Sequence, residues 1–255
     1  MKRIAIITGA SSGMGKRFVE TLDTFGKFDE VWAIARRADR LAALPAPCPV
    51  KPVPMDLSDP ASYERYQELL AAEDVSVGLL VNASGYGKFA AVMDTPLADN
   101  LNMVDLNCKA VIALCQLTIP YMEKDGTIIN IASVAAFQPI PYIDVYAATK
   151  SFVVSYSRAL NRELKNVHVM AVCPFWTKTE FFDRAIDKSK DAVVKKYAAM
   201  YDPKDIVARA WRDAKKHKEI SMYGFVARGQ AALVKLLPHD LVMKVWMGQQ
   251  GLTEK

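Results

Sequence analysis

Short apolar runs alternate along this chain with longer segments of helical periodicity. Nearly every position within a run is apolar, which is typical of a strand buried on both faces of a sheet. The clearest runs lie at residues 3–8, 31–35, 77–81, 127–132 and 168–173. Two weaker candidates are a short strand entered from the proline-rich loop at 45–54, and residues 220–223.

The segments between these runs predict helices. They reach from the first run to about residue 26, and continue at 59–72, at 96–122, around Tyr146 to about residue 164, and at 203–216. Strands that alternate with helices give a parallel sheet covered by helices on both faces. We therefore predict an α/β, doubly wound fold with about seven mostly parallel strands.

The 255 residues suit one large domain better than two small ones. Residues 175–203 are irregular and rich in aromatic side chains, which predicts a lid over the substrate. Residues 228–250 form an apolar tail with scattered charges, which predicts two short amphipathic helices. We expect the tail to pack on the lid or on a second subunit, and peripheral contact with a membrane surface is the alternative.

Composition excludes several classes of function. The net charge is +5 and the basic residues are scattered, so we expect no nucleic-acid partner. The four cysteines and three histidines form no metal-binding or disulfide pattern, so we expect no metal and a reducing compartment. No uninterrupted apolar stretch approaches 18 residues, so we expect no membrane span and a cytoplasmic protein.

A glycine-rich turn follows the first strand and opens a helix. This arrangement binds phosphate groups on the helix N-terminal N–H groups, and glycines let the backbone approach a pyrophosphate closely. The context of strand, turn and helix favours a dinucleotide site over a merely flexible loop. The candidate residues are Thr8, Gly9, Ser11, Ser12, Gly13, Met14 and Gly15.

The residues after the second strand indicate which dinucleotide binds. An NAD-binding protein places a carboxylate about twenty residues past the glycine turn, but this chain has Ala35 followed by Arg36 and Arg37. A guanidinium can bind a 2′-phosphate with charge-assisted hydrogen bonds, which favours NADP(H). Two alternatives stay open: the arginines are solvated loop charges, or Asp39 supplies the carboxylate.

Tyr146 and Lys150 lie four residues apart on a predicted helix and share one face. A cation about 4–5 Å from a phenol is worth roughly 3–4 kcal/mol, which predicts a phenol pKa lowered by about 2–3. Such a phenol can exchange protons with an alcohol or ketone near neutral pH. The glycine turn, residues 82–85, Ser133 and Pro174 all follow strand carboxyl ends, where ligands of parallel sheets bind, so we expect one shared site.

These residues together resemble the short-chain dehydrogenase/reductase family, in its short single-domain branch. The resemblance covers roughly the first 180 residues in the family's order and spacing. The chain departs from the family's pattern in two motifs: Ala83-Ser84 replaces Asn-Ala, and Phe175 replaces glycine beside the nicotinamide pocket. The matching motifs are Thr8-x-x-x-Gly13-x-Gly15, Asp56-Leu57, Asn82-Ala83-Ser84-Gly85, Asn107, Ser133 and Tyr146-x-x-x-Lys150.

The resemblance implies a Rossmann fold and an NADP(H)-dependent oxidoreductase that interconverts a ketone and a secondary alcohol. Tyr146 is then the general acid or base, and Lys150 lowers its pKa and bonds the nicotinamide ribose. Ser133 orients the substrate oxygen, and Asn107 holds a water in a relay to Lys150. The further cofactor contacts implied are Asp56, Leu57, Asn82, Ala83, Ser84, Gly85, Tyr146, Lys150, Pro174, Thr177 and Thr179.

The segments expected to contact the substrate are mostly apolar or aromatic, which favours a hydrophobic ligand such as a hydroxysteroid or a keto lipid. The candidate substrate contacts are Tyr86, Ser133, Val134, Tyr142, Tyr146, Phe175 and Trp176. We also expect a homodimer or homotetramer.

Two alternative functions stay open. One is reduction of carrier-bound 3-ketoacyl groups, since basic residues suit an acidic carrier. The other is a regulator that binds NADP without chemistry, because a fold does not dictate a function. The basic residues in question are Lys109, Lys188, Lys190, Lys195 and Lys196.

Overall fold

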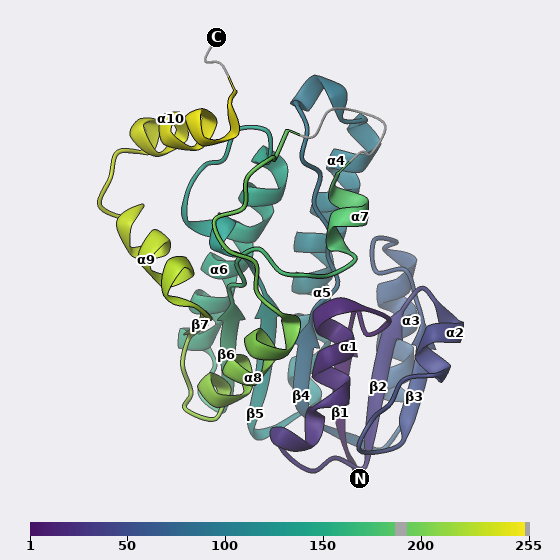
Figure 1. The fold of residues 1–255 in the computed structure, drawn as a ribbon. Helices are drawn as coiled ribbons and strands as arrows, with labels where there is room; N and C mark the ends of the chain where they lie inside the picture. The colour runs from purple at the N-terminus through teal and green to yellow at the C-terminus, as the bar shows by residue number, and fades with distance from the viewer. Residues whose placement is uncertain (187–192, 253–255) are drawn as a thin grey trace.

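The computed structural model describes residues 1–186 and 193–252, in which seven parallel strands form one sheet (Figure 1). Lys188 and Lys190 lie outside the described residues. The strand order is β3-β2-β1-β4-β5-β6-β7, so the chain winds outward from β1 in one direction and from β4 in the other. This confirms the predicted doubly wound sheet. The strands are β1 (Lys2–Thr8), β2 (Glu30–Ala35), β3 (Val50–Pro54), β4 (Val75–Asn82), β5 (Met122–Ile131), β6 (Val167–Val172) and β7 (Ile220–Ser221).

Helices cover both faces of the sheet (Figure 1). Side chains of α1 and α8 belong to the core cluster on one face, and those of α3, α5 and α6 to the cluster on the other. The helices are α1 (Gly13–Glu20), α2 (Ala38–Ala42), α3 (Ala61–Ala71), α4 (Leu97–Val104), α5 (Ala110–Thr118), α6 (Asp144–Glu163), α7 (Phe181–Ala185), α8 (Pro203–Ala214), α9 (Phe225–Leu233) and α10 (His239–Gln250).

Strand β1 explains why the apolar runs are continuous instead of alternating. Successive side chains of a strand point to opposite faces of its sheet. Ile4 and Ile6 pack into the cluster with α3, α5 and α6, and Ala5 and Ile7 into the cluster with α1 and α8. All four are fully buried, since each face of the sheet is covered by helices.

The helix predicted over residues 96–122 is present, but it is interrupted by the π-helical turn η3 (Asp105–Lys109) between α4 and α5. A π-turn inserts one extra residue per turn and often marks a functional site. By length and composition alone, Leu97–Tyr121 could cross a membrane, and it is the one such helix in the described part of the chain. Its Val111, Leu114 and Cys115 pack in the core against the sheet, as in a core helix of a globular domain.

Three elements, β5, α2 and α7, differ from the prediction. β5 begins at Met122, five residues before the predicted start, where Met122 pairs with Val77. The prediction missed this start because the polar segment Glu123–Asp125 interrupts the apolar pattern. The predicted short strand β3 is present and lies at the edge of the sheet. Proline has no N–H to donate to a neighbouring strand, so an edge strand can contain the prolines at 52 and 54. The short helices α2 and α7 span five residues each, too few to show helical periodicity.

The two predicted tail helices are observed as α9 and α10, and α10 packs on the lid segment. The Trp246 indole lies stacked 6.4 Å from that of Trp176, and its Nε1 donates to the Pro141 carbonyl (3.1 Å). Gln250 Oε1 accepts hydrogen bonds from the backbone N–H groups of Lys195 and Lys196 at 2.8 and 3.0 Å. Contact of the tail with a membrane surface stays a prediction. The exposed apolar side chains of the tail are Phe225, Val226, Leu233, Leu236, Leu241 and Val245.

Helix α1 is held mainly by packing, which a matched pair of substitutions tests. Phe18 is fully buried and contacts Trp211 of α8 edge-on at 4.8 Å, whereas Phe225 is 86% exposed. We expect Phe18→Ala to lower the free energy of unfolding by about 3–5 kcal/mol, and Phe225→Ala to change it by less than about 0.5 kcal/mol. Urea denaturation measures both, and a loss below about 1 kcal/mol for Phe18→Ala would contradict this account of the core.

Candidate active site

The loops that follow β1 and β4 meet at the carboxyl edge of the sheet. Gly9 has φ +64°, and a Cβ on it would lie 2.7 Å from the Ala83 carbonyl oxygen, so only glycine permits this contact. The Thr8 hydroxyl accepts hydrogen bonds from the N–H groups of Ala83 and Ser84, both at 3.0 Å. Thr8 is 1% exposed and therefore holds the two loops together behind the cleft wall.

The glycine turn fits the pyrophosphate of a dinucleotide. Helix α1 begins at Gly13, its N-cap Ser12 makes no side-chain hydrogen bond to it, and its first turn carries no acidic residue. Its N-terminal N–H groups are thus available to an anion in the cleft. The predicted residues that line this cleft are Gly9, Ser11, Ser12, Gly13, Met14, Gly15, Arg36, Arg37, Asp56, Leu57, Ala83, Ser84, Gly85 and Thr179.

Asn82 was predicted to contact the cofactor, but the structure places it behind the cleft. It is 2% exposed, and its Nδ2 donates to Asn130 Oδ1 on β5 at 2.8 Å. Asn130 Nδ2 in turn donates to the Ser157 hydroxyl on α6 (2.9 Å). The buried side chain of Asn82 therefore links β4 to β5.

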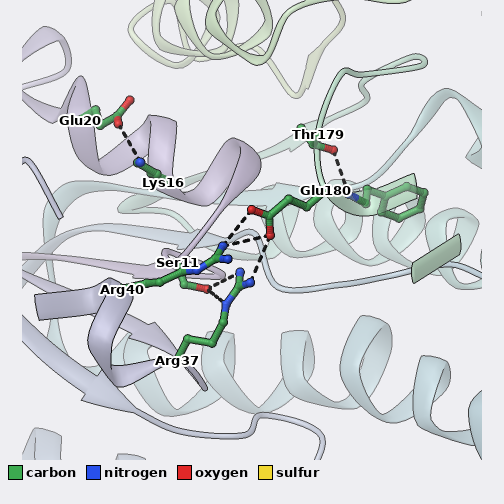
Figure 2. Close-up of polar contacts among 8 residues, drawn as sticks. Ser11, Lys16, Glu20, Arg37, Arg40, Thr179 and Glu180 are labelled. Atoms are coloured by element: carbon green, nitrogen blue, oxygen red, sulfur yellow. Dashed lines mark hydrogen bonds and ion pairs between the residues drawn. The ribbon is translucent and has the colours of Figure 1, made fainter. Parts of the chain in front are cut away.

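The two arginines after β2 have different partners. Arg36 faces Asp56, with NH1 3.8 Å from the Asp56 Oδ2. Arg37 donates from Nε and NH2 to the Ser11 hydroxyl at 3.2 and 3.0 Å, and from NH1 to Glu180 Oε2 at 3.1 Å (Figure 2). Arg40 of α2 donates to the same carboxylate. Neither Arg40 nor Glu180 was identified in the sequence, because this contact joins residues 140 positions apart.

Ser133, Tyr146 and Lys150 line one cavity together with Met14 of the glycine turn. Ser133 follows β5, and the other two lie on successive turns of α6. The Lys150 ammonium is 5% exposed and donates to the Ile131 carbonyl at 2.8 Å. A Cβ on Gly85 would lie 3.4 Å from Lys150 Nζ. Thus the loop after β4, the end of β5 and α6 converge on this amine.

Burial changes the pKa values of the two α6 side chains in opposite directions. Desolvation lowers the pKa of Lys150 to about 8, because it disfavours the charged amine. Desolvation raises the pKa of Tyr146 to about 12, while a hydrogen bond with Ser133 partly opposes this rise. The sequence-based expectation of a lowered phenol pKa is therefore wrong for the protein without cofactor. The Lys150 ammonium lies 5.7 Å from the centroid of the phenol ring and bonds Ile131, so its attraction does not overcome desolvation.

Asn107 lies in the π-turn η3 and is 1% exposed. Its Oδ1 accepts from the Tyr86 N–H (3.1 Å), and its Nδ2 donates to the Tyr86 carbonyl (2.9 Å) and to the Thr149 hydroxyl (3.0 Å). The side chain thereby fixes the segment after β4 against α6. Its predicted role in a water relay stays a prediction.

The catalytic side chains open into a cavity that several aromatic rings line. Of the predicted substrate contacts, Ser133, Val134, Tyr146, Phe175 and Trp176 line it, as do the predicted cofactor contacts Lys150, Pro174, Thr177 and Thr179. The segments expected to contact the substrate, residues 86–89, 134–142 and 175–201, supply several of the other walls, whereas the walls from the tail were not expected because the tail residues carry no local motif. These further residues include Phe89, Gln138, Ile140, Ile143, Phe181, Phe182, Lys196, Gln230, Trp246, Gln249 and Gln250.

Two predicted substrate contacts, Tyr86 and Tyr142, lie outside this cavity. Tyr86 lines the cofactor cleft, where its hydroxyl donates to the Asp99 carbonyl (2.9 Å) and the Arg184 guanidinium covers its ring at 3.4 Å. Tyr142 lies in the turn before α6, where its φ of +67° is left-handed.

Comparison with known proteins matches this geometry. A family model described as short chain dehydrogenase matches residues 3–190. The probable short-chain type dehydrogenase/reductase VdlC of Helicobacter pylori is 33% identical over 200 residues, covering 74% of this chain and 71% of that protein. The human very-long-chain 3-oxoacyl-CoA reductase is 30% identical over 190 residues, covering 69% of this chain but 60% of that protein.

A solved structure has the same fold over nearly its full length. The short-chain dehydrogenase from Sphingobium yanoikuyae in complex with NADPH superposes with a TM-score of 0.76 at 25% identity. The alignment covers 100% of this chain and 97% of that one. A nicotinamide cofactor in the cleft beside the glycine turn is consistent with both the match and the local geometry.

The lowered pKa of Lys150 predicts a pH dependence of stability. Below about pH 8 the amine is protonated in the folded and the unfolded chain, and above about 10.5 in neither. Between these values only the unfolded chain binds the proton, so the free energy of unfolding rises with pH. We expect the wild type to gain about 2 kcal/mol relative to Lys150→Met between about pH 7.5 and 10. Urea denaturation across this range measures the difference, and parallel pH profiles would contradict the assignment.

Proposed function

Because the chain belongs to the short-chain dehydrogenase/reductase family and is an oxidoreductase acting on CH–OH groups, we propose that it interconverts a ketone and a secondary alcohol on a bulky apolar substrate with NADP(H). The observation that carries this proposal is the meeting of Tyr146, Ser133 and Lys150 with Met14 of the glycine turn in one cavity. A proton donor and the cofactor cleft thereby adjoin the same substrate space.

The side chains divide the proton chemistry among them. The bound nicotinamide supplies or accepts the hydride. With its pKa raised to about 12, the phenol of Tyr146 is protonated at neutral pH and serves as the general acid for a ketone oxygen. Ser133 orients that oxygen, and Lys150, protonated below about pH 8 and with its ammonium 5.7 Å from the centroid of the phenol ring, can replenish the phenol proton. In the oxidative direction Tyr146 acts as the base.

The lining of the cavity supports a hydrophobic substrate. Aromatic rings from the loop after β4, the lid and the tail line the cavity together with Tyr146: Phe89, Phe175, Trp176, Phe181, Phe182 and Trp246. Such walls favour a bulky apolar group next to the reacting carbonyl. Either a hydroxysteroid or a keto lipid has this character.

A 3-ketoacyl thioester is a second candidate, favoured by one observation. Lys196 lines the cavity, and its carbonyl accepts a hydrogen bond from Gln250 Nε2 of the tail (3.1 Å), so its ammonium could face the acidic carrier of an acyl chain. The similarity to the human very-long-chain 3-oxoacyl-CoA reductase also supports a 3-ketoacyl thioester as substrate. This candidate uses the same proton donor, Tyr146, as the first. It differs in its substrate, which is an acyl chain attached to a carrier.

Removing the phenol hydroxyl tests the assignment. We expect Tyr146→Phe to reduce turnover by about 10²–10⁴-fold, the usual contribution of general acid catalysis, while NADPH still binds. Tyr142→Phe removes the same hydroxyl from a residue outside the cavity and should keep wild-type turnover. NADPH consumption with steroid ketones, long-chain 3-keto thioesters and small ketones measures both variants. Wild-type turnover by Tyr146→Phe would exclude the proposed acid.

The cofactor preference has its own test. Arg37 is fixed by Ser11 at the rim of the cofactor cleft, where a guanidinium can bind a 2′-phosphate. We expect the wild type to bind NADPH at least about tenfold more tightly than NADH, and Arg37→Ala to remove most of this difference while NADH affinity stays within about twofold. Fluorescence titration with each cofactor measures the ratio. Equal affinities in the wild type would overturn the NADP(H) proposal and leave the reaction class intact.

A further inference from the structure

One carboxylate joins two guanidinium groups at the rim of the cofactor cleft (Figure 2). Glu180 Oε1 accepts from Arg40 NH1 at 2.8 Å, and Oε2 accepts from NH1 of Arg40 and of Arg37, both at 3.1 Å. Arg37 also binds the Ser11 hydroxyl through Nε and NH2. The glycine turn therefore fixes one guanidinium, and the carboxylate lies across both.

The carboxylate and the two cations come from opposite rims of the cleft. Arg37 and Arg40 follow β2, whereas Glu180 follows Thr179 of the lid and directly precedes α7. Ser11, Arg37 and Glu180 all line the cofactor cleft. The ion pairs thus connect the lid to the opposite rim, across the space that a dinucleotide occupies.

The arrangement is suited to exchange of anions. Two guanidinium groups that bind the two oxygens of a carboxylate can bind a phosphate in the same way, with more charge on the anion. The side chains of Arg37, Arg40 and Glu180 are 40–50% exposed, and exposed ion pairs are weak. The arginines hold the pKa of Glu180 below its ordinary value through hydrogen bonds, first that of Arg40, so the resident group is an anion at neutral pH.

We propose that Glu180 is an internal anion that holds the lid on Arg37 and Arg40 until the 2′-phosphate of NADP(H) displaces it. This inference rests on the proposed NADP(H) preference and deepens it. A dinucleotide without the 2′-phosphate leaves the ion pairs intact. Glu180 is thereby a specificity-determining residue that competes with the ligand instead of contacting it favourably.

The displaced carboxylate is connected to the substrate cavity through one residue. Phe181, the next residue, lines both the cofactor cleft and the cavity, and its ring lies 5.4 Å from that of Tyr146. At the other end of α7, the Ala185 carbonyl accepts from the N–H of Phe89, another wall of the cavity. Release of Glu180 therefore frees the segment that walls the substrate space, so the phosphorylated cofactor prepares the site for substrate.

Two fragments of the cofactor isolate the 2′-phosphate. We compare binding of 2′,5′-ADP and 5′-AMP by calorimetry to the wild type and to Glu180→Gln, which removes the charge and keeps the shape. The matched control is Glu20→Gln on α1. Glu20 forms ion pairs with Lys16 (Figure 2) and Arg17, which are not the arginines that Glu180 binds. It removes an equal charge from a similar ion pair.

We expect Glu180→Gln to bind 2′,5′-ADP about three- to tenfold more tightly than the wild type does, the range for one or two exposed ion pairs. Its affinity for 5′-AMP, and both affinities of Glu20→Gln, should stay within about twofold. Hydrogen–deuterium exchange of peptides that contain residues 177–186 should rise in the wild type on addition of 2′,5′-ADP and not of 5′-AMP. In Glu180→Gln it should be raised before any ligand is added.

Three results would overturn the proposal. Unchanged affinity of Glu180→Gln for 2′,5′-ADP would show that the carboxylate does not compete, and weaker affinity would show that it positions the arginines for the phosphate. An equal gain for both fragments would indicate a general charge effect. A wild type that does not distinguish NADPH from NADH refutes the cofactor preference itself, which separates that failure from a failure of the lid contact alone.

Discussion

The close contact between the loops after β1 and β4 is the constraint on which the rest of the site depends. Gly9 can approach the Ala83 carbonyl only because it lacks a Cβ, and Thr8 binds two N–H groups of the same loop. This contact sets the distance between the glycine turn and Gly85, and Gly85 in turn lies against Asn107 and Lys150. The cofactor cleft and the catalytic helix are therefore positioned by backbone contacts, with few flexible side chains between them.

Desolvation, and not charge attraction, dominates the electrostatics around Tyr146 and Lys150. A phenol and an amine four residues apart were expected to stabilise each other's charged forms, yet burial favours the neutral form of both. A neutral phenol is the species that donates a proton to a ketone oxygen. The phenol of Tyr146 can therefore donate a proton without a prior change in its protonation, and the Lys150 amine titrates close to the physiological range.

The fold could be predicted from the sequence because strand and helix periodicities are local and strong. The continuous apolar runs of β1, β2, β4 and β6 reflect burial on both faces, and the positions of Ser133, Tyr146 and Lys150 follow from where these elements end. Prediction failed where the outcome depended on distant partners. The pKa of the Tyr146 phenol depends on how deeply α6 is buried. The left-handed backbone of Tyr142, and the contact of Glu180 with Arg40 140 positions away, have no local signal in the sequence.

The cavity walls supplied by α10 have an evolutionary consequence. Trp246, Gln249 and Gln250 adjoin the substrate space, whereas the family match ends at residue 190. The reactive groups therefore lie in the matched portion of the chain, together with walls such as Phe89 and Phe175, whereas the α10 walls lie outside it. Replacement of the last few dozen codons could give the same acid–base machinery a new repertoire, and divergence between paralogues should be concentrated there.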